Sequence, residues 1–197
     1  MAIIASGKGG GDFELCPTGN IQAVCAFVED VGHEHSDLNS TWTHKVVILW
    51  ELAEKMRDGR PFMLSKSYTI SLHEKASLRK ELASWRGKDF TPAELDGFDL
   101  EKLLNVNCLL NVVAYKKRDG SEGRKIASVS PIIKGMNLLI PVNEKCPDWV
   151  SKRRDENEAA YSKSDAVPVV VTGLAEDVKK LAAAPVNPAD DHHLPPF

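Results

Sequence analysis

The sequence has no long apolar run, no closely spaced pair of cysteines and no excess of basic charge. Every apolar run falls well short of the roughly 20 residues that cross a bilayer, and the first residues lack a basic segment followed by an apolar one. The four cysteines, Cys16, Cys25, Cys108 and Cys146, are scattered without a Cys-x-x-Cys pair, which argues against a zinc ribbon or a disulfide framework. We therefore expect a cytoplasmic protein with reduced thiols and no membrane contact.

Signatures of catalysis and of cofactor binding are also missing. The glycine-rich stretch from Gly7 to Gly11 lacks the spacing of a nucleotide-binding P-loop, and no predicted strand precedes it. His33, His35 and Asp37 are compatible with a metal site, but a polar loop explains this common spacing as well. We expect no enzymatic activity, no cofactor and no metal, and we keep a metal-dependent nuclease as a third, weaker alternative.

The composition is that of a folded protein of ordinary character. Hydrophobic residues make up 43% and charged residues 27% of the 197 residues, and the formal net charge is -3. The acidic excess lies after Ile140, so the preceding body is electrically neutral. Any nucleic-acid surface must therefore come from the local placement of Lys and Arg rather than from a bulk excess.

Apolar periodicity predicts strands first, then helices, then strands again. Strands are predicted over 20–31, 41–52, 62–70, 108–117 and 124–133. Between the third and fourth strands, Ser71 and Glu74 form a capping-box pattern before Leu78, Leu82 and Trp85, and Gly87 marks the helix end. A second box at 91–94 and a cap at Asp99 predict two short helical turns.

This order favours a mainly β protein with the OB-fold, a five-stranded Greek-key barrel whose helix lies between strands 3 and 4. We expect residues 1–12 to be a flexible leader and residues 13–142 to form the barrel. The charged and Ala/Pro-rich remainder, 143–197, is predicted to be a largely disordered tail.

Aromatic and basic residues on the predicted strands supply what single-stranded nucleic acid needs, flat rings for bases and cations for phosphates. The basic residues from Lys116 to Lys125 flank one predicted hairpin turn, between the fourth and fifth strands. In OB-folds this turn borders the nucleic-acid face. The candidates are Trp42, His44, Lys45, Phe62, Lys66, Tyr68, Tyr115, Lys116, Lys117, Arg118, Arg124 and Lys125.

Several rings have a second interpretation as core residues. Trp50 and Trp85 are better explained as core. Phe62 and Tyr68 share a predicted face with Lys66 but also with apolar neighbours, so both interpretations stay open for them. Trp42, beside a polar loop, is the best stacking candidate.

The stretch from Ser71 to Val113 carries a resemblance to a known family. Its segments Ser-Leu-His-Glu-Lys-Ala-Ser-Leu-Arg-Lys-Glu-Leu, Trp85-Arg86-Gly87-Lys88 and Leu109-Leu110-Asn111-Val112 resemble proteins encoded by bacteriophages and prophages. Those proteins are regarded as OB-fold single-stranded DNA-binding proteins of replication and recombination. The resemblance covers about residues 13–135 and implies strand coating in the host cytoplasm.

The final eight residues resemble the acidic tip with which single-stranded DNA-binding proteins recruit partner enzymes. The resemblance implies that such a tip contacts a helicase, polymerase or recombinase. The residues concerned are Asp190, Asp191, Leu194, Pro195, Pro196 and Phe197.

We therefore expect a protein that coats single-stranded DNA without sequence specificity during phage DNA replication or recombination. This expectation is compatible with a homo-oligomer. The alternative is an OB-like adaptor that binds proteins and no nucleic acid, which the neutral body favours.

Overall fold

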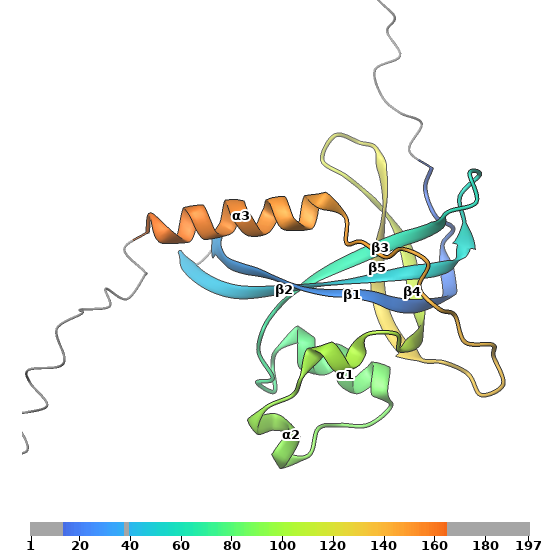
Figure 1. Ribbon diagram of the computed structural model, residues 1–197, viewed down its shortest axis with the longest axis horizontal. Coiled ribbons are helices and arrows are strands. Elements are labelled where there is room, and N and C mark those ends of the chain that lie inside the picture. The colour runs from blue at the N-terminus through green and yellow to red at the C-terminus, as the bar shows by residue number, and fades with distance from the viewer. Residues whose placement is uncertain (1–13, 38–39, 165–197) are drawn as a thin grey trace, which may run out of the picture. The chain divides into compact units, whose positions relative to one another are not determined.

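The computed structural model describes residues 14–37 and 40–164, which form one compact unit dominated by a twisted antiparallel sheet (Figure 1). The strands are β1 (Gly19–Ser36), β2 (Thr41–Lys55), β3 (Pro61–Thr69), β4 (Asn107–Lys116) and β5 (Glu122–Pro131). The helices are α1 (Ser77–Arg86), α2 (Pro92–Asp96), the 3₁₀ turn η1 (Leu100–Leu103) and α3 (Asp148–Ser162). The protein is thus mainly β with a few helices, as the strand pattern predicted.

The sheet has the order β3-β2-β1-β4-β5, so the long β1 pairs with β2 along one side and with β4 along the other. Irregular register at Cys25/Phe27 and at Asp30/His33 bends β1, because a bulge increases the local twist of a strand. The two edge strands, β3 and β5, approach one another without pairing in the described part of the chain. The sheet is therefore open, and an OB barrel is not established by it.

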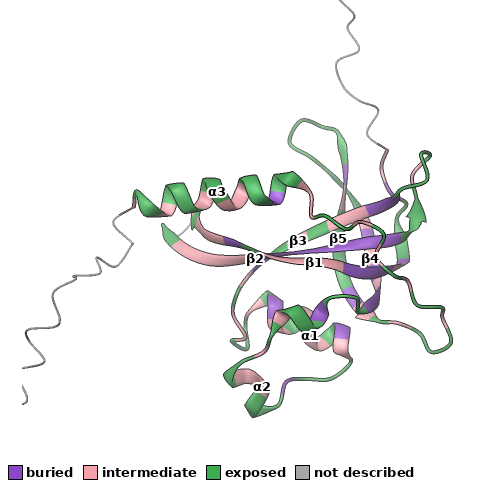
Figure 2. Ribbon diagram, viewed as in Figure 1, coloured by how far each residue is buried: buried purple, intermediate pink, exposed green. Residues whose placement is uncertain are grey.

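The main core lies on the face of the sheet against which α1 packs. Leu78, Leu82 and Trp85 are buried along one face of α1, and Trp50 meets Trp85 with ring centroids 5.7 Å apart. The two tryptophans are core residues, as their sequence context indicated. Figure 2 shows the buried residues concentrated in the middle of the strands and on the sheet-facing side of α1.

The helix caps agree with the sequence in part. Thr91 and Glu94 form the expected capping box, Asp99 caps η1, and Gly87 ends α1 in the left-handed conformation with φ 66°. The box predicted at Ser71 does not form. Ser71 instead accepts a hydrogen bond from the amide of His73, and α1 begins only at Ser77.

Helix α3 corrects the prediction of a tail beginning at residue 143. It packs on the face of β1 and β2 opposite to the main core, where Val150 joins Val31, Val47 and Leu49 in a second, smaller core. Its other contacts are ion pairs, hydrogen bonds and ring contacts of Tyr161, so no apolar periodicity revealed it in the sequence. The compact unit consequently extends to Ser164. Within the described residues, no helix is long and apolar enough to cross a membrane.

Candidate nucleic-acid interface

The β4–β5 hairpin and the edge strand β3 enclose a cleft of about 430 Å³, here called the basic cleft. Four of the predicted binding residues line it: Phe62, Tyr115, Lys117 and Arg124. Its floor is apolar, with Met63 and Leu64 from β3 and Cys16 from the segment before β1. Side chains that are far apart in the sequence therefore meet at one cleft.

Tyr115 and Gly123 are direct partners across the β4–β5 ladder, and the ring of Tyr115 lies over the glycine. A Cβ atom at residue 123 would stand 2.7 Å from Cε1 of Tyr115, so only glycine leaves room for this ring position. The Lys125 ammonium lies 5.8 Å from the ring centroid, and the Tyr115 side chain is 39% exposed. The hairpin thus presents an accessible aromatic ring beside a cation.

Arg124 is occupied by the protein itself. Its Nε donates to the carbonyl of Cys16 at 2.7 Å, its Nη1 pairs with Glu122, and its side chain is only 15% exposed. It therefore holds the segment before β1 against β5 and is not available as a primary phosphate ligand.

The other hairpin cations are exposed: Lys116, Lys117, Arg118 and Lys125. None of them forms an ion pair with another described residue. Asp119 at the hairpin tip adds a negative charge among these cations. Hydrogen bonds from Ser121 and the nearby charge of Lys117 hold the pKa of the Asp119 carboxyl below its usual value, so it is ionised. The four exposed cations outnumber this single carboxylate, so the hairpin still favours binding of a phosphate backbone.

Arg60 is a cleft residue that the sequence did not single out. It lies in the β2–β3 turn and lines the basic cleft opposite Tyr115 and Lys117. Asp58 pairs with it, and hydrogen bonds from Arg60 lower the pKa of that carboxyl. The turn itself was predicted, but its proximity to the hairpin follows from the curl of the sheet, which no local pattern encodes.

Phe62 and Tyr68 are corrected from stacking candidates to core residues. Their exposures are 7% and 2%, so a base has no open ring face to contact. Burial raises the pKa of the Tyr68 hydroxyl, and the neighbouring carboxylate of Glu81 raises it further. Lys66 shares their face and pairs with Glu81 of α1, while Lys45 donates to Thr69 Oγ1 at 3.0 Å. Neither lysine lines the basic cleft.

Trp42 and His44 lie at the other end of β2, where the β1–β2 hairpin meets α3 (Figure 1). The His33 ring is stacked between His44 and Tyr161, with centroid distances of 4.6 and 4.2 Å. Trp42 contacts Tyr161 edge-on at 5.2 Å. These rings dock α3 on the sheet and are separated from the basic cleft by most of the length of β2.

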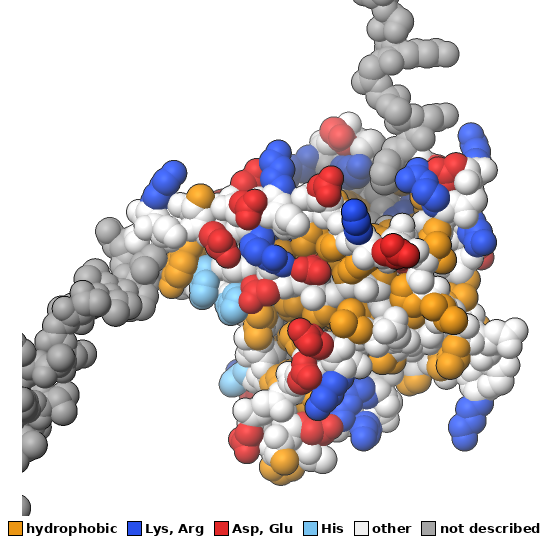
Figure 3. Space-filling model, viewed as in Figure 1, with side chains coloured by type: hydrophobic (Ala, Val, Ile, Leu, Met, Phe, Trp, Pro, Cys, Tyr) orange, Lys and Arg blue, Asp and Glu red, His pale blue; other side chains and the backbone are white. Residues whose placement is uncertain are grey.

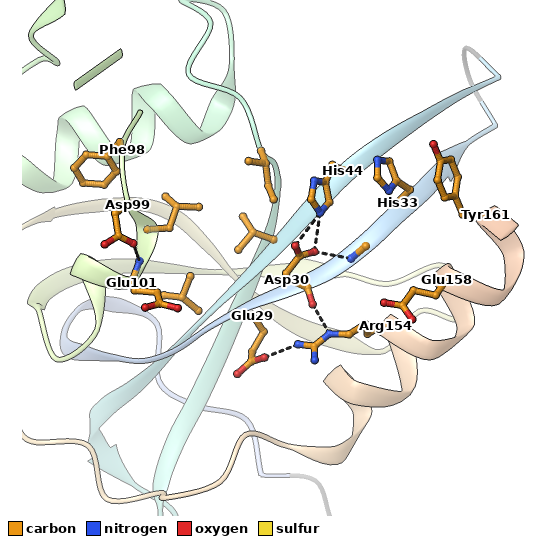
Figure 4. Close-up of a pocket in the computed structure, with 15 residues that line it drawn as sticks. Glu29, Asp30, His33, His44, Phe98, Asp99, Glu101, Arg154, Glu158 and Tyr161 are labelled. Carbon is orange, nitrogen blue, oxygen red and sulfur yellow. Dashed lines mark hydrogen bonds and ion pairs between the residues drawn. The ribbon is translucent and has the colours of Figure 1, made fainter. Parts of the chain in front are cut away.

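This aromatic group borders a second and larger cleft, of about 860 Å³, here called the acidic cleft (Figure 4). Its charged lining consists of Glu29, Asp30, Asp99, Glu101, Glu158 and Arg154. Figure 3 likewise shows histidines beside acidic side chains on this part of the surface. Five carboxylates against one guanidinium repel phosphates, so nucleic acid is not expected to enter here.

Asp30 organises the acidic cleft. Its carboxylate contacts His44 Nε2 at 2.8 and 2.9 Å and accepts from the amide of Gly32 at 2.8 Å. Burial by itself raises the pKa of Asp30, but the hydrogen bonds from Gly32 and His44, with the charge of Arg154, leave it below its usual value. Asp30 thus stays ionised and fixes the His44 ring.

The metal alternative at His33, His35 and Asp37 finds no support in the geometry. His35 Nδ1 lies 3.3 Å from Asp37, whereas His33 is occupied by ring stacking. Within residues 14–37 and 40–164, no group of three or more His, Cys, Asp or Glu side chains is arranged to hold a metal ion. The predicted partner-binding residues 190–197 lie outside the described residues.

A comparison with protein-family models and another with curated proteins each gave no match to this chain. The resemblance to phage single-stranded DNA-binding proteins therefore rests on the sequence segments alone.

Proposed function

We propose that the protein binds single-stranded DNA without sequence specificity at the basic cleft and the β4–β5 hairpin beside it. The observation that carries this proposal is the exposed Tyr115 ring, held over Gly123 at the basic cleft, with the Lys125 ammonium 5.8 Å from its centroid and the exposed Lys116, Lys117 and Arg118 on the same hairpin. Such a platform accepts any base, because every base has a face that stacks. The role in phage replication or recombination follows from the family resemblance.

We also infer that the curled sheet is a form of the OB-fold. In support, β1 pairs with both β2 and β4, the edges β3 and β5 approach one another, and α1, α2 and η1 occur between β3 and β4. In OB-folds the loop between strands 4 and 5 borders the bound strand. The basic hairpin occupies that position here.

Binding would proceed without a chemical step. A base stacks on Tyr115 and contributes about 1 to 3 kcal/mol, while the hairpin cations neutralise phosphates and release counterions. The C-terminal tip, Asp190 to Phe197, would remain available to recruit a helicase, polymerase or recombinase.

The test compares variants of Tyr115 by fluorescence anisotropy with a labelled oligo-dT strand. Tyr115→Phe keeps the ring and should bind as the unaltered protein does, whereas Tyr115→Ala should lose at least fivefold in affinity, since one stack contributes about 1 kcal/mol or more. Equal affinities of the two variants would show that Tyr115 does not stack on the bound strand.

A set of lysine variants tests the phosphate contacts. Replacing Lys116, Lys117 and Lys125 with Gln should weaken binding by more than tenfold at low salt. The matched control replaces Lys75, Lys80 and Lys88, which are exposed on and around α1, and should leave affinity unchanged. Similar losses in both sets would indicate unspecific attraction rather than a site.

An adaptor that binds proteins is the second candidate function, and the acidic cleft favours it. A cleft of this size with five carboxylates is suited to a basic protein segment and unsuited to DNA. The adaptor predicts no binding of oligo-dT at any salt concentration, which distinguishes it from the first proposal.

A further inference from the structure

Glu51 is a buried carboxyl on β2 that apolar packing and ion pairing do not explain. Its exposure is 2%, and none of the ion pairs among residues 14–37 and 40–164 includes it. Val47 and Leu49, which share its face of β2, are packed with Val150 in the second core. Removing a carboxyl group from water is costly unless hydrogen bonds replace its hydration. The hydrogen bonds that Glu51 accepts therefore indicate its role.

Glu51 accepts three hydrogen bonds from one distant segment of the chain. Its Oε2 accepts from the amide of Val142 at 2.7 Å. Its Oε1 accepts from the amide of Asn143 at 2.9 Å and from Nδ2 of the same residue at 2.7 Å. Both carboxyl oxygens are thus occupied, and they attach to β2 the segment from Val142 to Pro147, here called the cleft wall.

The cleft wall is one side of the basic cleft. Asn143 and Pro147 line the cleft together with Met63, which is the cross-strand partner of Glu51 in the β2–β3 ladder. The far end of the wall is fixed as well, because Pro147 leads into α3 and Val150 of that helix is buried. Glu51 itself does not line the cleft, so it acts on the cleft only through the wall.

We propose that Glu51 is a positioning residue of the DNA site, because it holds the cleft wall where a base that stacks on Tyr115 also contacts the wall. This role rests on the proposed binding of single-stranded DNA. Tyr115, Asn143 and Pro147 line the same cleft, and a base that enters it gains apolar contact from each side. When the bonds to Glu51 break, the cleft loses one side. Strand binding therefore favours the closed wall and must protect these bonds.

Hydrogen exchange at the amides of Val142 and Asn143 tests the role without altering the chain. Both amides donate to Glu51, so they exchange with solvent when the wall opens. Oligo-dT at ten times its Kd should slow their exchange about tenfold. The amide of Leu139 is the internal control: it donates to the buried Asn107, neither residue lines the basic cleft, and its exchange should not change.

The possible outcomes distinguish this role from the proposed function. If oligo-dT binds but leaves the exchange of both wall amides unchanged, or slows the Leu139 amide equally, the role of Glu51 is wrong and the proposed function stands. Absence of oligo-dT binding contradicts the proposed function and this role with it.

Glu51→Gln tests the same role by affinity. Glutamine keeps the shape of the side chain, but its NH₂ group cannot accept a hydrogen bond, so a wall amide loses its partner. At equal concentrations of folded protein, oligo-dT affinity should fall about threefold or more, and much less in a Tyr115→Ala background, because both contacts act on one base.

Asn157→Ala is the matched control for Glu51→Gln. It removes a hydrogen bond between α3 and the carbonyl of Val31, on the same face of the sheet but outside the cleft lining. It should lower stability to urea without changing oligo-dT affinity. An affinity of Glu51→Gln equal to that of the unaltered protein, or an equal loss in Asn157→Ala, overturns the proposal.

Discussion

Glycine at position 123 shows how one residue type positions a candidate binding group. The absence of a side chain there lets Tyr115 lie flat across the hairpin, which leaves part of the ring open and brings Lys125 to its face. The sequence drew attention to Tyr115 and the surrounding cations. It did not indicate Gly123, because the cross-strand pairing of these two residues depends on the register of the hairpin.

Gly123→Ala should therefore weaken DNA binding more than it weakens the fold. The new methyl group displaces the Tyr115 ring, so we expect at least a fivefold loss of oligo-dT affinity with a stability cost of about 1 kcal/mol. The comparison is made by anisotropy and urea unfolding.

Gly97→Ala serves as its control, because a Cβ atom there meets no atom within 4 Å and the backbone is extended. Combining Gly123→Ala with Tyr115→Ala should cause no further loss beyond Tyr115→Ala alone. Additive losses would show that the glycine acts through something other than the ring.

Helix α3 is the element that the sequence failed to predict. Only Val150 is fully buried on it, and its remaining hold on the sheet comes from pairs of Arg153 with Glu34 and of Arg154 with Glu29, together with the stack at Tyr161. Because these contacts are made by charged and aromatic side chains, the sequence of α3 has no apolar residues repeating with the period of a helix. The strands and α1, by contrast, were predictable because buried residues recur along them with the period of the element.

At the candidate site, too, some residues could be predicted from local sequence and others could not. The hairpin cations and Tyr115 could be proposed as site residues from composition and turn position, both of which are local. The burial of Phe62 and Tyr68 depends on which face of β3 meets α1, and both interpretations were open until packing was known. Trp42 was assigned from its place beside a polar loop, while its contact with Tyr161 comes from a helix 119 residues later in the chain.

The ionised Asp30 makes the β1–β2 end of the molecule sensitive to acid. A carboxyl whose pKa is lowered by folding contributes stability above its unfolded value, and this contribution is lost as the pH falls through the lower folded value. The melting temperature of the unaltered protein should therefore decline below about pH 4. Asp30→Asn should melt lower at pH 7 and decline less over the same range, as measured by circular dichroism; parallel curves would contradict this role.

At the scale of the whole molecule, positive and negative side chains are concentrated in different clefts, although the net charge is small. The basic cleft lies at the end of β2 near the β2–β3 turn, and the acidic cleft lies near the β1–β2 hairpin. A formal net charge of -3 thus conceals two surfaces of opposite preference. This separation is compatible with a strand at one end of the sheet and protein contacts at other places.

Removing the acidic tip, Asp190 to Phe197, should alter DNA binding and partner binding in opposite directions. If the tip competes with phosphate for the hairpin cations, its loss tightens oligo-dT binding about two- to tenfold at low salt and abolishes recruitment of the partner enzyme. Anisotropy and pull-down with a candidate helicase or recombinase measure the two effects. Weaker DNA binding after the deletion would contradict competition.

The most direct test of the account is the salt dependence of oligo-dT binding by the full chain. If the four exposed hairpin cations contact phosphates, the logarithm of the association constant should fall with the logarithm of salt concentration with a slope of about -3, while duplex DNA binds more weakly. Absence of oligo-dT binding at low salt, or a slope near zero, would contradict a nucleic-acid interface at the basic cleft.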